Sequence, residues 1–162
     1  LCDRRQRQMC IRDRFLWVTF PLLKEIWKVI DAWGFTYKSV AFVWIKQNKK
    51  ADSLFWGMGY WTRANAEICI LATKGSPKRY SKRVHQVIVS HIEEHSKKPE
   101  EARRRIEQLM GDVPRIELFA RRETPGWDVW GNEVACSLGT EILQENKRKE
   151  TSEKKMGDLL NL

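Results

Sequence analysis

The stretch FLWVTFPLLKEIWKVIDAWGFTYKSVAFVWI, residues 15–45, contains the pattern of a strand, a helix and a second strand. Residues 15–20 form an unbroken apolar run of the length of a buried strand. Pro21 suits the first turn of a helix, apolar residues then recur at helical spacing, and Gly34 is placed to end that helix. Residues 37–45 are β-branched and aromatic, which predicts a second strand. The stretch therefore predicts an α/β fold.

The rest of the chain continues this alternation. Further strands are predicted at residues 66–73 (AEICILAT), 86–92 (QVIVSHI), 115–120 (RIELFA) and 127–130 (WDVW), and a helix between Pro99 and Gly111. Strands that alternate with helices are typical of a parallel-rich α/β sheet. From about residue 137 the sequence is polar and helix-prone, which predicts a tail without a core of its own.

Composition limits the class of protein. The 162 residues are 42% hydrophobic, which is enough for one globular domain with a core. No apolar run approaches the ~20 residues of a membrane span, and no leader pattern is visible, so we expect a soluble cytoplasmic protein with no membrane partner. The four cysteines have no zinc-ligand spacing, which predicts reduced thiols and no metal.

Charge and aromatic content point to a polyanionic partner. The net charge is +9, and eight tryptophans are many for this length. Basic residues follow the predicted strands, namely Lys46, Lys49 and Lys50 after the second and Lys74, Lys78 and Arg79 after the third. If the strands are parallel, these residues meet at one edge, where a phosphate backbone and a stacked base would bind. The pattern supports a solvated surface equally well.

Several familiar nucleotide and catalytic motifs are missing. No GxGxxG follows a predicted strand, and neither GxxxxGK[ST] nor GxSxG occurs. These absences weaken the dehydrogenase, P-loop and serine-hydrolase hypotheses. The residues alone therefore predict a basic α/β domain with a ligand-binding edge.

Six runs in fixed order carry a family resemblance. They are FLWVTF, WIKQN (residues 44–48), GYW…AEICILATKG (59–75), HSKKPEE (95–101), RIELFARR (115–122) and GWDVWGNE (126–133). Together they resemble the adenine-N6 methyltransferase family that contains the catalytic subunit of the eukaryotic messenger-RNA adenosine methyltransferase. The runs RRETPGWDVWGNE and LFWGMGYWTRANAEIC look closest to its phage and bacterial DNA adenine methyltransferase branch.

The resemblance implies a fold and an activity. The fold would be a Rossmann-like methyltransferase sheet with permuted motif order, and the cofactor S-adenosylmethionine. The activity would be methylation of the exocyclic N6 amine of adenine in DNA. Methylation of RNA, and a non-catalytic nucleic-acid-binding subunit, are the two alternatives; the oligomeric state stays open.

The resemblance also implies roles for particular residues. Glu67 and Lys98 would be catalytic, with Glu67 facing the target adenine. Lys98, Glu117, Arg121, Asn132 and Glu133 would hold S-adenosylmethionine, while Trp44, Tyr60 and Arg63 would line the base pocket beside the nucleic-acid-binding Lys46, Lys49 and Lys50. Other interpretations are simpler: Glu117 as a strand-end surface acid, Asn132 as a turn former and Trp44 as core packing.

The first fourteen residues, LCDRRQRQMCIRDR, have no helical or strand period and contain five arginines. They are either a basic nucleic-acid-binding arm or a segment that is not native, and the abrupt change to FLWVTF favours the second. The family's Asp-Pro-Pro-Trp loop would precede FLWVTF, yet no Asp-Pro occurs in the chain. We therefore expect a methyltransferase domain at residues 15–134 that is incomplete at its N-terminus and inactive as given, followed by a polar helical tail at 135–162.

Overall fold

The computed structural model describes residues 12–135, which form two compact units divided after Gly111. The first unit contains β1 (Arg12–Val18), η1 (Phe20–Leu22), α2 (Leu23–Ala32), β2 (Thr36–Gln47), β3 (Ala66–Lys74), β4 (Val87–His91) and α3 (Glu100–Met110), and the second contains β5 (Ile116–Leu118) and β6 (Asp128–Trp130). The predictions for residues 1–11 and for the tail from 136 lie outside the described residues. All the predicted strands and helices within 12–135 are present, with bounds shifted by a few residues.

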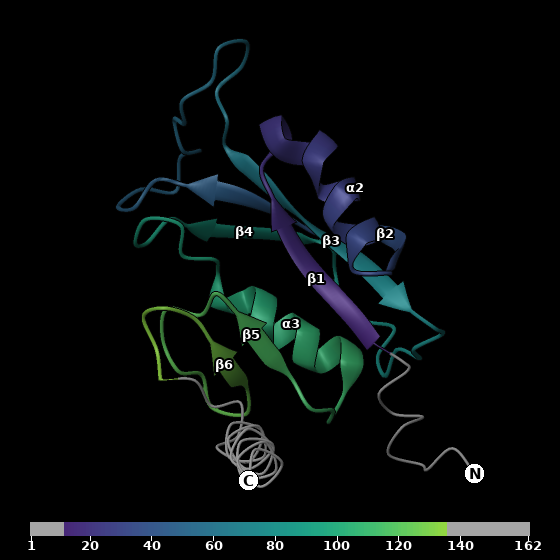
Figure 1. The fold of residues 1–162 in the computed structure, drawn as a ribbon. Coiled ribbons are helices and arrows are strands. Elements are labelled where there is room, and N and C mark those ends of the chain that lie inside the picture. The colour runs from purple at the N-terminus through teal and green to yellow at the C-terminus, as the bar shows by residue number, and fades with distance from the viewer. Residues whose placement is uncertain (1–11, 136–162) are drawn as a thin grey trace, which may run out of the picture. The chain divides into compact units, whose positions relative to one another are not determined.

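The first unit is built on a four-stranded sheet in the order β1-β3-β2-β4 (Figure 1). β3 pairs antiparallel with both β1 and β2, whereas β2 and β4 are parallel. It follows that β1, β2 and β4 run in one direction and β3 runs against them. The mixed α/β fold is confirmed. The predicted parallel pairing is right for β2 and β4 but wrong for the two pairs that β3 makes, because β3 returns from a long loop and inserts between β1 and β2 in the opposite direction.

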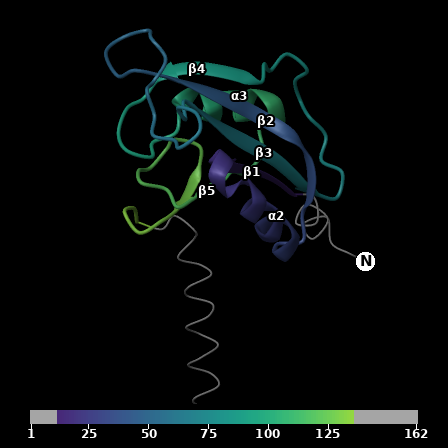
Figure 2. The same ribbon diagram turned by 90° about the horizontal axis from the view of Figure 1, so that it is seen from above.

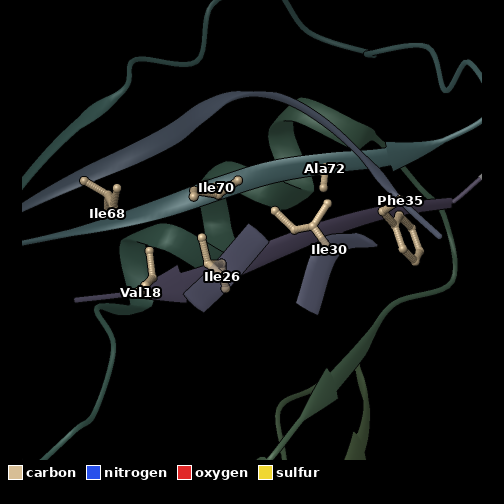
Figure 3. Close-up of a cluster of buried hydrophobic side chains, with 7 residues drawn as sticks. All are labelled: Val18, Ile26, Ile30, Phe35, Ile68, Ile70 and Ala72. Atoms are coloured by element: carbon tan, nitrogen blue, oxygen red, sulfur yellow. The ribbon is translucent and has the colours of Figure 1, made fainter. Parts of the chain in front are cut away.

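One face of this sheet packs against α2. Ile26 and Ile30, four residues apart on the helix, are 8% and 2% exposed. They meet the side chains of alternate β3 residues, as the two-residue period of a strand requires. The buried cluster comprises Val18, Ile26, Ile30, Phe35, Ile68, Ile70 and Ala72 (Figure 3). Burial of each large aliphatic side chain contributes about 1.5 to 3 kcal/mol to the free energy of folding. This cluster therefore holds α2 against the sheet.

The opposite face carries aromatic side chains, and Figures 1 and 2 show α3 on this side of the sheet. The Phe15 ring stacks on Phe42 with centroids 6.1 Å apart. Arg105 of α3 donates hydrogen bonds of 2.7 Å to the carbonyls of His85 and Val87, which joins the helix to the start of β4. Cys69 is completely buried on this face, and burial raises the pKa of its thiol. The apolar run of β3 therefore buries this thiol in its protonated form.

β1 begins at Arg12, three residues before the predicted strand. Asp13 lies opposite Thr73 of β3 in the antiparallel register. The expectation that residues 1–14 lack a strand is therefore wrong for 12–14, because backbone pairing with β3 continues past the apolar run. Burial raises the pKa of Asp13, although the neighbouring positive charge of Arg14 lowers it in part.

We expect Asp13→Asn to stabilise the protein at pH 7, by up to about 1 kcal/mol. Because the pKa of Asp13 is raised in the folded state, its carboxylate disfavours folding above the ordinary value of 3.8. This penalty is relieved as the pH falls through the folded-state pKa, so the gain should disappear in acid. Urea unfolding at pH 7 and at about pH 3 measures both values, with the exposed Asp112→Asn as control. A gain that is equal at both pH values would contradict the prediction.

Candidate functional site

The site lies at one edge of the sheet of the first unit. β1, β2 and β4 end at this edge and β3 begins there, since Val18 pairs with Ile68 and Gln47 with His91. Ile45 of β2 pairs with Ala66, the first residue of β3. The side chains that follow these strand ends therefore converge with the first side chains of β3.

Glu67 is at the centre of this edge. The residue is 7% exposed, which is rare for a glutamate. The Lys46 ammonium lies 2.6 Å from its Oε1, and the Lys98 ammonium donates to its Oε2. Each carboxylate oxygen thus accepts a charge-assisted hydrogen bond from a different lysine.

The strand register explains how the three residues meet. Trp44 lies directly opposite Glu67, and Lys46 is two residues further along β2, hence on the same face. Lys98 arrives from the segment that precedes α3. The structure therefore brings together Glu67 and Lys98, both predicted catalytic residues. Lys46 also pairs with Glu67, and this pairing was not predicted.

Electrostatics keep the Glu67 carboxylate ionised. Burial by itself would raise its pKa, but the hydrogen bonds and positive charges of Lys46 and Lys98 outweigh burial. The net effect is a pKa of Glu67 below the ordinary value of 4.5. At neutral pH the site therefore presents a negative charge with a positive charge on either side.

Each of the two lysines has its ammonium group beside a tryptophan ring. The Lys46 ammonium lies 5.1 Å from the Trp44 ring centroid, and the Lys98 ammonium lies 5.7 Å from that of Trp17. The Trp44 indole donates a 2.9 Å hydrogen bond to the Ser90 hydroxyl, and its residue is 3% exposed. Cation–π attraction holds the ammonium groups in place. Trp44 is thus a buried wall of the site, which agrees with the core-packing interpretation.

The basic residues at the ends of β2 and β3 lie at opposite ends of the sheet. Lys49 and Lys50 are exposed in the loop that follows β2 at the Glu67 edge. Lys74 ends β3 and pairs with Arg12 at the start of β1, so it lies at the opposite end. The expectation that Lys74 shares the edge with Lys46 is therefore wrong. The cause is the antiparallel direction of β3.

Tyr60 and Arg63 belong to the loop between β2 and β3. Tyr60 is 92% exposed, and the Arg63 guanidinium lies 5.1 Å from the centroid of the Trp56 ring within the loop. Their predicted role at the base pocket stays a prediction.

The second unit contains the other predicted cofactor residues. Arg121 follows β5, Glu133 follows β6, and their side chains form a 3.2 Å ion pair. The parallel pairing of β5 and β6 places these two strand ends side by side, and the Ala120 amide donates to the Trp130 carbonyl at 3.0 Å. Asn132 is exposed in the turn after β6 and Glu117 lies within β5. The structure thus brings together Arg121 and Glu133.

The turn after β6 requires glycine at one position. A Cβ on Gly131 would lie 2.2 Å from the carbonyl oxygen of Ala120, which no side chain tolerates. This close approach keeps the segment with Asn132 and Glu133 against the residue that precedes Arg121. The sequence shows a glycine in the GNE run, but only the folded structure shows that this glycine lies against Ala120.

Two further observations concern residues 12–135. No three or more His, Cys, Asp and Glu side chains gather there in a way that would hold a metal ion. Among the helices described, none has the length and apolar character to cross a bilayer.

Comparison with known proteins identifies the family. The sequence model described as MT-A70 matches residues 8–133, which is more than three quarters of the chain. The chain therefore belongs to the MT-A70 family, and the resemblance found in its motifs is confirmed.

Named relatives give the family an activity. The chain is 34% identical over 122 residues to the type II methyltransferase M.MunI of a Mycoplasma species, covering 74% of this chain and 49% of that protein. It is 31% identical over 125 residues to the human N(6)-adenosine-methyltransferase catalytic subunit METTL3, covering 74% of this chain and 21% of that subunit. A Medicago truncatula protein named as a putative N(6)-adenosine-methyltransferase is 32% identical over 138 residues, 83% of this chain and 22% of its own length. The chain spans about half of the first relative and about a fifth of the others.

Proposed function

We propose that this chain is part of an enzyme that methylates the N6 amine of adenine in DNA, with S-adenosylmethionine as the methyl donor. One observation carries the proposal: a buried glutamate, held ionised by two lysines, lies where three strands end in a member of the MT-A70 family. The relatives named as N(6)-adenosine-methyltransferases support the reaction.

Glu67 has the chemistry that an adenine amine requires. The amine offers two N–H donors, and an ionised carboxylate accepts such donors strongly. Each Glu67 oxygen already accepts a hydrogen bond from Lys46 or Lys98. An incoming amine would therefore displace one of the two ammonium groups, or donate to the same carboxylate oxygen as that ammonium group. In either case the hydrogen bond would fix the direction of the nitrogen lone pair, and positioning of this kind is a large part of catalysis of group transfer.

The residues of the second unit fit S-adenosylmethionine by their donor set. A carboxylate accepts hydrogen bonds from ribose hydroxyls, and a guanidinium pairs with an amino-acid carboxylate. Glu117, Arg121, Asn132 and Glu133 supply a guanidinium, an amide and two carboxylates around the ends of β5 and β6. When bound, S-adenosylmethionine supplies an electrophilic methyl group, while these side chains would hold and orient it.

We expect Arg121→Ala to weaken S-adenosylmethionine binding about tenfold, which is the effect of losing one charge-assisted contact. Isothermal titration calorimetry with the purified protein measures the dissociation constant. Arg122→Ala, at the adjacent exposed position, is the matched control and should bind within about twofold of the unchanged protein. Equal losses in both variants would show a general charge effect and contradict the assignment.

The choice of DNA rests on the resemblance of the runs around Gly59 and Gly126 to the phage and bacterial branch. A second candidate, RNA, is favoured by the word adenosine in the names of the plant and human relatives. A non-catalytic binding subunit is a third. Intact HSKKPEE, RIELFAR and GNE runs argue against it.

Single-turnover methyl transfer separates these candidates. The 162-residue chain, and a form extended by the coding sequence upstream of Phe15 in its gene, are each incubated with matched DNA and RNA oligonucleotides. N6-methyladenine in DNA alone supports the proposal, and methylation of RNA alone supports the second candidate. If the extended form binds S-adenosylmethionine and methylates neither substrate, the non-catalytic alternative is correct.

A further inference from the structure

The loop between β2 and β3 carries the most exposed apolar side chains described in the chain. Met58, Tyr60 and Trp61 are 92%, 92% and 91% exposed, and Trp56 is 73% exposed. Figures 1 and 2 both show this loop projecting away from the sheet. The rings of Tyr60 and Trp61 contact edge to face, 5.1 Å apart. Apolar side chains that gather on a surface mark a site of interaction.

The shape of this loop is built into its sequence. A Cβ on Gly57 would lie 1.8 Å from the Ala64 carbonyl oxygen, and one on Gly59 would lie 2.0 Å from that of Thr62. The two arms of the loop therefore run in backbone contact, which only glycine permits at these positions. Residues 56–64 thus form a narrow stalk with Tyr60 and Trp61 at its tip.

The stalk is rooted at the Glu67 site. The Phe55 amide donates to the Lys46 carbonyl at 2.8 Å, and the Lys46 amide donates to the Asn65 carbonyl at 2.8 Å. Both arms are therefore hydrogen-bonded to the backbone of the residue whose ammonium holds Glu67. The stalk therefore begins and ends beside the backbone of Lys46, next to the candidate site.

Charge indicates which partner the tip would meet. Residues 46–65 contain four basic side chains, Lys46, Lys49, Lys50 and Arg63, and one acidic side chain, Asp52. Lys49 and Lys50 are exposed at the base of the stalk. Aromatic rings that stand beside basic side chains fit stacked bases on a phosphate backbone.

We propose that residues 55–65 are a base-stacking finger, in which Tyr60 and Trp61 stack on unpaired bases next to the target adenine. This rests on the proposed nucleic-acid substrate and adds how the strand is held. The bases adjoining an extracted adenine lose a stacking partner, and a π-surface at the tip offsets that loss. Lys49 and Lys50 would contact the phosphates of the same strand.

The test is the salt dependence of binding to a fluorescein-labelled single-stranded DNA dodecamer, followed by anisotropy with the 162-residue chain. We expect Tyr60→Ala/Trp61→Ala to weaken binding about tenfold or more at every salt concentration, with the slope against salt unchanged. Lys49→Ala/Lys50→Ala should instead make the slope shallower by about 1 to 1.5. Trp33→Ala, which removes a partly exposed tryptophan at the end of α2, is the control and should leave both quantities unchanged.

Each other outcome overturns the finger. Wild-type binding that Tyr60→Ala/Trp61→Ala leaves unchanged would exclude stacking by the tip while leaving the proposed methyltransferase function intact. A dimer in sedimentation that this variant converts to a monomer, without loss of affinity, would make the tip an interface between copies of the chain. If the wild-type chain binds neither DNA nor RNA, the nucleic-acid substrate fails together with the finger. Unchanged thermal unfolding of the variant shows that any loss of affinity is local.

Discussion

Under the proposed function, Glu67→Gln is expected to reduce methyl transfer to adenine by about a hundredfold to a thousandfold, in whichever of the 162-residue chain and its extended form shows transfer. The amide has the shape of the carboxylate but no charge, and its NH₂ group is a donor where two ammonium donors already converge. A preorganised hydrogen-bond partner in a buried site is worth a factor of this size. Single-turnover transfer of a radiolabelled methyl group to an adenine-containing duplex measures the effect.

A matched control distinguishes a role in catalysis from a general change of charge. Glu101 of α3 is also paired with two cations, Arg104 and Arg105, and its pKa is lowered although burial opposes this. Glu101→Gln should change the rate less than about twofold. A Glu67→Gln enzyme that works at the wild-type rate would remove Glu67 from the mechanism, and S-adenosylmethionine affinity within about twofold of wild type would place any loss in the chemical step.

The two lysines explain how a carboxylate is kept charged in a place that is almost closed to water. Desolvation alone would favour the protonated acid, which is a poor acceptor for an amine. Lys46 and Lys98 reverse this preference, and the Trp44 and Trp17 rings in turn stabilise the ammonium groups. The site therefore combines an acceptor for N–H groups with cations that would attract a phosphate-rich substrate.

The helices and strands were predictable because their signals are local. Pro21 and Gly34 enclose α2, and Pro99 and Gly111 enclose α3, as the sequence indicated. Gly34 and Gly111 have φ angles of 69° and 75°, values that favour glycine. Periodicity and end signals therefore located the elements to within a few residues.

The direction of β3 was not predictable from the same signals. Its apolar pattern fits a strand that runs either way, and the long loop before it allows both a crossover and a return. The structure shows the return, with Ala66 opposite Ile45. That choice puts Glu67, at the start of β3, beside Lys46 and moves Lys74 to the far end.

The centre of the candidate site was predicted only in part. Family resemblance singled out Glu67 and Lys98 separately, and nothing local in the sequence says that residues 31 positions apart share an ion pair. Lys46 was assigned to phosphate binding because it is basic and follows a strand. Its pairing with Glu67 depends on the β2–β3 register, which the sequence pattern leaves open.

Glu67→Ala is expected to lower the free energy of unfolding by about 3 kcal/mol at pH 7. Removal of the shared partner leaves the ammonium groups of Lys46 and Lys98 at side-chain exposures of only 16% and 28%, without a counter-charge. Breaking a buried ion pair from one side costs about 3 to 5 kcal/mol, and the partial exposure of the lysines favours the lower end. Urea unfolding followed by circular dichroism measures the loss.

The loss should depend on pH with a defined sign. Because the pKa of Glu67 is lowered in the folded state, the ionised carboxylate stabilises the fold above the ordinary value of 4.5. That stabilisation is lost as the pH falls through the folded-state pKa, so the difference between wild type and Glu67→Ala should shrink in acid. The combined variant Lys46→Met/Glu67→Leu/Lys98→Met removes all three charges and should recover most of the stability at pH 7, since apolar side chains of similar size replace a buried ionic cluster without penalty. A combined variant as unstable as Glu67→Ala would mean that packing around residue 67, and not the stranded lysine charges, causes the loss.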